Sequence, residues 1–119
     1  MNLYPDIILD HYQNPRNTGS LAGFTHSASE VNPFCGDGVK VQLKIENSKL
    51  KIMRYRAVGC AISIASASML SEYVIGKNSG QVLAMDSGDV LNLLGVELTM
   101  TRVKCATLPL LAIQKALGK

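Results

Sequence analysis

Apolar and polar residues alternate in the middle of the chain. From residue 39 to residue 46 every second position is apolar, and after Asn47-Ser48 a similar alternation runs from residue 49 to residue 58. Successive side chains of a strand point to opposite faces, so this period of two predicts two strands with one buried face each. The short turn between them favours an antiparallel hairpin. A further short strand is expected close to Glu30, which gives a sheet of about three strands.

Longer apolar periods flank the hairpin and predict helices. In the first helix, over residues 3–12, apolar residues recur at three- and four-residue steps, and Pro5 lies in the first turn, where a missing N–H costs little. A long helix is expected from about Cys60 to Ile75, with shorter ones at 79–85 and 89–94. The last helix is expected from about Thr107 to Leu117, with Thr107 as its cap and Pro109 in its first turn.

The order helix, strands, helices predicts an α+β fold in which helices pack on one face of a small antiparallel sheet. The chain has 119 residues, of which 47% are hydrophobic and 18% charged, and this is typical of a folded globular protein. We expect one domain over residues 1–119. The formal net charge is only +3 and the basic residues are scattered, so we expect no nucleic-acid partner. No signal peptide and no membrane-spanning stretch is recognisable, which favours a cytoplasmic protein.

Three cysteines and one aspartate are the candidates for chemistry. Cys35 precedes the predicted hairpin, Cys60 lies where strand gives way to helix, and Cys105 precedes the last predicted helix. An odd number of widely spaced cysteines is a poor disulfide framework, so free thiols are expected. A helix N-terminus favours an anion, and we therefore expect lowered pKa values for Cys60 and Cys105. Asp37 lies two residues after Cys35 between two glycines, which let the backbone bring both side chains to one point.

A structural interpretation of the same residues stays open. A single cysteine in an apolar segment is more often a small core residue than a ligand, and three dispersed cysteines without a close pair are a weak metal signal. The Gly-Asp-Gly sequence around Asp37 is also a common turn. His11 and His26 do not strengthen the metal hypothesis, because both are expected at the surface.

Four segments of the sequence together resemble a known family. These segments are residues 10–17 (DHYQNPRN), 32–37 (NPFCGD), 59–69 (GCAISIASASM) and 102–108 (RVKCATL). They resemble, in the same order, motifs of the U-type iron–sulfur cluster assembly scaffolds, the family of IscU, SufU and the N-terminal domain of NifU. The resemblance spans nearly the whole chain and implies an α+β fold of the SufE/NifU-like type.

The resemblance also implies a site. By motif position the ligands are Cys35, Asp37, Cys60 and Cys105, which hold Zn²⁺ at rest, or iron and a [2Fe–2S] cluster during assembly. A pyridoxal-phosphate cysteine desulfurase is the implied donor of persulfide sulfur, with Cys105 as the acceptor, and apoproteins are the implied recipients. We expect Lys104 to support Cys105, because its ammonium group should lower the pKa of the thiol. A monomer or a weak homo-oligomer is expected.

Two departures leave the subtype open. Lys104 stands where IscU-type members carry histidine, and the IscU chaperone-binding segment is missing, so this part of the chain is SufU-like. The interval between Cys60 and Cys105, however, is too short for the usual SufU insertion. Three hypotheses follow: a cluster scaffold, a zinc-dependent sulfurtransferase that carries no cluster, and a structural zinc module. A scaffold without enzymatic activity is favoured.

Overall fold

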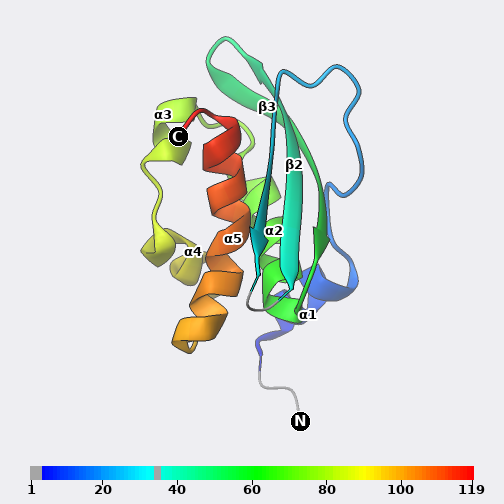
Figure 1. The fold of residues 1–119 in the computed structure, drawn as a ribbon. Coiled ribbons are helices and arrows are strands. Elements are labelled where there is room, and N and C mark those ends of the chain that lie inside the picture. Colours follow the sequence, from blue (N-terminus) through cyan, green and yellow to red (C-terminus); the bar gives the residue numbers. More distant parts are fainter. Residues whose placement is uncertain (1–3, 34–35) are drawn as a thin grey trace.

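The structure is a computed structural model that describes residues 4–33 and 36–119. Eight elements follow one another in the order helix, three strands, four helices, as Figure 1 shows. They are α1 (Asp6–Gln13), β1 (His26–Asn32), β2 (Asp37–Glu46), β3 (Lys49–Val58), α2 (Ala61–Val74), α3 (Ser79–Leu83), α4 (Ser87–Leu94) and α5 (Met100–Ala116).

The three strands form one antiparallel sheet in the order β1-β2-β3, which confirms the predicted hairpin and its companion strand. The hairpin turns at Asn47 and Ser48, whose φ angles of 53° and 64° are those of a two-residue turn with left-handed central residues. One face of the sheet is buried: Val41, Leu43 and Met53 have no exposed surface. Helix α5 packs on β1 and β2 and helix α2 on β3, so the fold is α+β with the helices on this face.

Helix α1 buries a different face from the one that its apolar residues predict. Ile8 is fully buried, but Ile7 and Tyr12 remain 51% and 42% exposed. His11 is buried, so the expectation that it lies at the surface is wrong. Its Nδ1 atom lies 2.7 Å from the Ser68 hydroxyl of α2, and this hydrogen bond compensates for the burial of the imidazole ring. His26, at the start of β1, is partly exposed.

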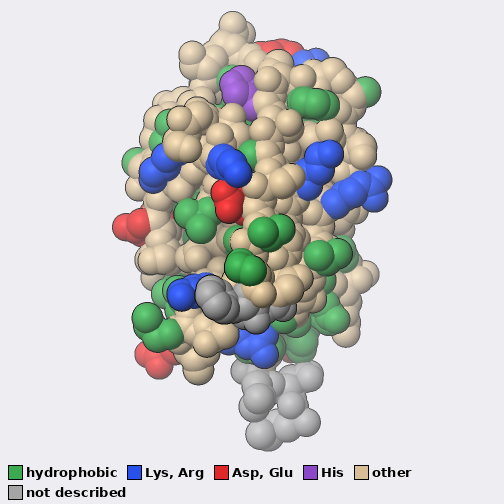
Figure 2. Space-filling model, viewed as in Figure 1, with side chains coloured by type: hydrophobic (Ala, Val, Ile, Leu, Met, Phe, Trp, Pro, Cys, Tyr) green, Lys and Arg blue, Asp and Glu red, His purple; other side chains and the backbone are tan. Residues whose placement is uncertain are grey.

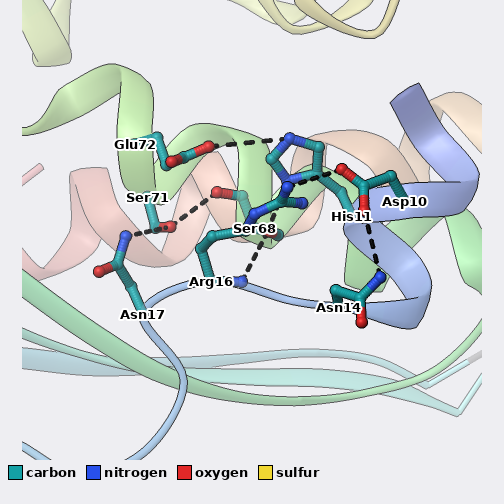
Figure 3. A network of polar contacts seen from close by, with 8 residues as sticks. All are labelled: Asp10, His11, Asn14, Arg16, Asn17, Ser68, Ser71 and Glu72. Carbon is teal, nitrogen blue, oxygen red and sulfur yellow. Dashed lines mark hydrogen bonds and ion pairs between the residues drawn. The ribbon is translucent and has the colours of Figure 1, made fainter.

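The segment after α1 is fixed to α2 by polar contacts (Figure 3). The guanidinium of Arg16 lies 2.6 Å from the Asp10 carboxylate, and the Arg16 backbone N–H donates to the Ser68 hydroxyl at 2.9 Å. The Asn17 amide donates to the Ser71 hydroxyl at 2.9 Å. In Figure 3 the Asp10 carboxylate faces Asn14 and Arg16 within the DHYQNPRN segment, whereas the Asn17 amide reaches Ser71 of α2.

The last helix begins seven residues earlier than predicted. Thr99 caps α5 by accepting a hydrogen bond from the backbone N–H of Arg102, whereas the Thr107 hydroxyl donates to the carbonyl of Val103. Pro109 therefore lies inside the helix and not in its first turn. Consequently Cys105 lies within α5. The expectation that it precedes the last helix is wrong.

Candidate metal centre

Three of the four predicted ligands meet at one end of the sheet. Asp37 is the first residue of β2, Cys60 is the N-cap of α2, and Cys105 lies in the second turn of α5. One carboxylate oxygen of Asp37 and the two sulfur atoms all lie within 4.8 Å of one another. The fourth predicted ligand, Cys35, falls outside the described residues. These three side chains line a pocket of about 300 Å³ together with Gly59, Thr101 and Arg102.

Gly59 is the residue that allows β3 and α2 to meet close to Asp37. Its φ angle of 149° lies in the region that favours glycine. A Cβ atom at this position would lie 2.5 Å from the Ser63 Oγ and 2.8 Å from the Asp37 Cγ, which is shorter than van der Waals contact. The absence of a side chain at Gly59 thus lets the Asp37 carboxyl approach the beginning of α2, where Cys60 lies.

The position of Cys60 favours its thiolate form. Burial acts to raise its pKa, but hydrogen bonds from the backbone N–H and the side chain of Ser63 and from the backbone N–H of Ile62 together outweigh burial, and the pKa of Cys60 is lowered. These N–H groups belong to the first turn of α2, where they have no partner within the helix. The expectation of a lowered pKa at a helix N-terminus is confirmed for Cys60.

The same expectation is wrong for Cys105. This thiol is only 2% exposed, and burial together with the neighbouring Asp37 and Cys60 raises its pKa well above the ordinary range. The physical reason is its location: the second turn of α5 lacks the free N–H groups of a helix start, and two acidic groups face the sulfur atom. A bound metal cation would instead lower the pKa of Cys105, because coordination to a metal deprotonates a thiol.

The surroundings of the Asp37 carboxylate show whether these residues fit a metal ion. Its side chain is 3% exposed, and Oδ2 is buried without a hydrogen-bond partner among the described residues. An unpaired buried carboxylate oxygen is unfavourable, and coordination would satisfy it. Zn²⁺ is bound in proteins by thiolate sulfur and carboxylate oxygen, usually with four ligands. Asp37, Cys60 and Cys105 supply donors of these types at one point, so they fit zinc.

Arg102 is the cation of this site. It is exposed and lines the pocket, and interaction with the neighbouring Cys60 raises the pKa of the guanidinium group. Lys104, which the sequence analysis placed in a supporting role, is exposed and does not line the pocket. Sequence reasoning missed Arg102 because it placed the start of the last helix too late. With the helix starting at Met100, residues 102 and 105 are three apart and share a face.

The fold and the site together define a class: a small α+β protein with a carboxylate–thiolate metal site at the end of its sheet. The chain matches the family described as the NifU-like N-terminal domain over residues 3–119. It belongs to this family, which is that of the iron–sulfur cluster assembly scaffolds, and the resemblance seen in the four motifs is confirmed.

Characterised relatives of both subtypes are similar over almost the whole chain. The zinc-dependent sulfurtransferase SufU of Bacillus subtilis (strain 168) is 34% identical over 134 residues, which cover 98% of this chain and 90% of the relative. The iron–sulfur cluster assembly scaffold protein IscU of Escherichia coli (strain K12) is 33% identical over 122 residues, which cover 97% and 91%.

Solved structures support the same fold. The chain resembles a protein from Fervidobacterium islandicum AW-1, described as an iron–sulfur cluster assembly scaffold for the SUF system. The TM-score is 0.82 and the identity 25%, and the likeness covers 96% of each chain. An N-terminal NifU-like protein from Brucella abortus has the same fold, with a TM-score of 0.76 at 20% identity over 95% of this chain and 90% of that chain. Among the described residues, no helix is both long and apolar enough to cross a membrane.

Proposed function

We propose that Cys35, Asp37, Cys60 and Cys105 hold one zinc ion at rest, and that the protein accepts sulfur at this site from a cysteine desulfurase. The observation that carries the proposal is the convergence of Asp37, Cys60 and Cys105, together with an Asp37 carboxylate oxygen that has no hydrogen-bond partner in the part of the chain that the structure describes. The zinc-dependent sulfurtransferase among the relatives supports the choice of metal. When bound, zinc keeps the cysteines ionised, and the ionised form is also the nucleophilic one.

Cys105 is the proposed acceptor. Its thiolate attacks the outer sulfur of a persulfide on the donor, the donor's S–S bond breaks, and the donor leaves as a thiolate. Cys105 then carries the added sulfur as a persulfide, and no oxidant or reductant is consumed. Cys60 is the rival acceptor, because it is less buried than Cys105 and has the lower pKa in the absence of metal.

A scaffold role is the second candidate function, in which a [2Fe–2S] cluster is cargo passed to recipient apoproteins. The alignment with SufU extends over 134 positions, whereas this chain has 119 residues, so the sulfurtransferase carries insertions that this chain lacks. The alignment with the scaffold IscU of Escherichia coli (strain K12) extends over 122 positions and needs far fewer, but that with the scaffold IscU of Streptococcus pyogenes serotype M1 extends over 135. Alignment length therefore leaves the scaffold role open beside the sulfurtransferase role. A purely structural zinc module fits less well, because structural zinc sites are closed and this site opens into a pocket.

The test starts from protein purified without air, with its zinc, iron and sulfide measured. The protein is then incubated with a cysteine desulfurase and cysteine, alkylated, and digested, and the added sulfur is located by peptide mass. We expect about one zinc per chain and persulfide on Cys105. Sulfur found only on Cys60 would overturn the assignment of the acceptor, and a Cys60→Ser/Cys105→Ser variant that keeps its zinc would overturn the site.

A further inference from the structure

The most exposed large apolar side chains surround the metal centre. Among the described residues Met100, Val31 and Val58 are 80%, 68% and 66% exposed, more than any other large hydrophobic side chain. Met100 directly precedes Thr101 of the pocket, and Val58 directly precedes Gly59. Val31 is the register partner of Gly38, the residue after Asp37. Hydrophobic side chains gather accordingly on the lower half of the face seen in Figure 2. Exposed apolar groups clustered at one site are typical of a protein interface.

Val31 and Val58 form one continuous strip across the outward face of the sheet. Gly38 pairs with both, on β1 and on β3. A Cβ atom on Gly38 would lie 3.5 Å from Val31 Cγ1 and 3.7 Å from Val58 Cγ2, so the side chains of both valines lie beside the glycine. The strip is apolar and close to the metal centre, because Gly38 follows Asp37 on β2 and Val58 precedes Gly59 at the end of β3.

The next row of the outward face is basic. Lys40 and Arg56 are direct register partners, and both are exposed. Like charges directly opposite one another in a sheet are destabilising. Neither residue takes part in the ion pairs found within residues 4–33 and 36–119. Over the strands, on the right of Figure 2, basic side chains gather without an acidic one among them.

A small pocket lies between the two cations. Its volume is about 50 Å³, and it is lined by Gly19, Ser20, Lys40, Gln42 and Arg56. The loop that forms its wall is fixed: the Gly19 N–H donates to the Tyr55 carbonyl at 2.9 Å, and the Leu21 N–H donates to Gln42 Oε1 at 2.8 Å. Because Gln42 Oε1 accepts that bond, its amide N–H₂ group is the end left to donate. One water occupies about 30 Å³ in the liquid, so this pocket has room for one group the size of a carboxylate.

We propose that this Lys40–Arg56 pocket receives a carboxylate side chain of the protein that donates sulfur, while apolar side chains of the same protein cover Val31, Val58 and Met100. The proposal rests on the proposed function and names the docking contact of that site. Two rows of a strand are about 7 Å apart, so one extended segment with an apolar and an acidic residue can span both. A free phosphate or a nucleic acid would leave the apolar strip uncovered, which is why a protein partner is favoured.

The test separates docking from chemistry by using two sulfur donors. The variants are Lys40→Gln/Arg56→Gln and Lys40→Glu/Arg56→Glu, and the matched control is Lys49→Glu/Lys51→Glu at the far end of the hairpin. Each is loaded with sulfur from a cysteine desulfurase that the parent accepts sulfur from, and separately from glutathione persulfide, which needs no protein contact. Zinc content and melting temperature are measured for all.

We expect loading by the desulfurase to slow about tenfold in the Gln pair, the effect of losing roughly 1.4 kcal/mol, and more in the Glu pair. Loading by glutathione persulfide and zinc content should stay at the parent level, and the control should stay within about twofold of the parent. Parent-like loading of the Glu pair by the desulfurase, or an equal loss in the control, would overturn the docking pocket and leave the proposed function standing. If no cysteine desulfurase loads the parent with sulfur, the proposed function is overturned, and the docking proposal with it.

Discussion

Arg102 lies one helical turn before Cys105 on α5, yet it is Cys60, at the start of α2, that chiefly raises the pKa of its guanidinium group. The cation therefore interacts across the site with the cysteine of the other helix. Because the interaction raises the pKa of Arg102, reciprocity requires that it also favours the thiolate of Cys60.

Replacing Arg102 by glutamine should therefore make Cys60 less reactive. Loss of the cation raises the pKa of the Cys60 thiol, so in zinc-free protein the pH profile of its alkylation should move to higher pH. Iodoacetamide labelling followed by peptide mass measures this profile. Lys104→Gln is the matched control, since it removes a positive charge that does not line the pocket. Equal shifts in the two variants would show that only the net charge matters.

Gly59→Ala should remove the metal site without removing the ligands. The new Cβ would collide with Asp37 and Ser63, and the φ angle of 149° is strained for alanine. We expect a loss of about 1–3 kcal/mol of stability and less than half the parent's zinc content, read from thermal melts and metal analysis. Gly23→Ala is the control: its φ is also positive, at 74°, but nothing lies within 4 Å of the new Cβ. Full zinc binding in Gly59→Ala would contradict the close approach of Asp37.

Asp37→Ala should lengthen the lifetime of an assembled cluster. A carboxylate oxygen is a more labile ligand for an iron–sulfur cluster than a thiolate, and we expect it to promote release. After reconstitution with iron and sulfide, the decay of the cluster absorbance in air should be several-fold slower in the variant. Asp6→Ala, at an exposed position in the first turn of α1, is the control. A decay as fast as the parent's would rule out this role for Asp37.

His11 should make the protein sensitive to acid. Burial first, and then the charge of Arg16, lowers the pKa of His11, so the folded state holds this ring neutral. In the unfolded state it binds a proton near its ordinary pKa of about 6.5. Stability is therefore fully present above that pH and falls as the pH drops through it toward the lower folded value. Thermal melts between pH 5 and pH 8 should show a steeper loss in the parent than in His11→Asn. His26→Asn, at a partly exposed position, should follow the parent curve.

The sequence was sufficient for the parts of the fold that follow a simple period. The alternation over residues 39–58 predicted β2, β3 and their turn, and the long apolar helix after Cys60 agrees with α2. The start of α5 is not evident in the sequence, because residues 100–104 carry no clear apolar period and because Pro109 is typical of the first turn of a helix. Tertiary packing explains the tolerance of this proline: it is buried in the interior of α5, the helix that packs on the sheet.

The convergence of three predicted ligands could be found from the sequence, but the electrostatics of the site only in part. Motif order named Asp37, Cys60 and Cys105, and the structure brings these three together. The burial of Cys105 and the contact between Arg102 and Cys60 depend on where α5 begins and how it lies against α2. Neither is encoded in the spacing of the cysteines. His11 was misjudged for a similar reason, because its partner Ser68 is distant in the sequence.

Three ligands of the proposed site, Asp37, Cys60 and Cys105, are far apart along the chain, since Cys60 follows Asp37 by 23 positions and Cys105 follows Cys60 by 45. A metal ion shared by all three acts as a cross-link that closes both long segments, so metal affinity and folding free energy are thermodynamically linked. Exchange of one ligand during sulfur transfer would release one of these chain segments from the metal, while the other ligands stay bound. The end of the sheet would then gain mobility at the moment when the partner protein is docked beside it, and would lose that mobility again when the ligand returns.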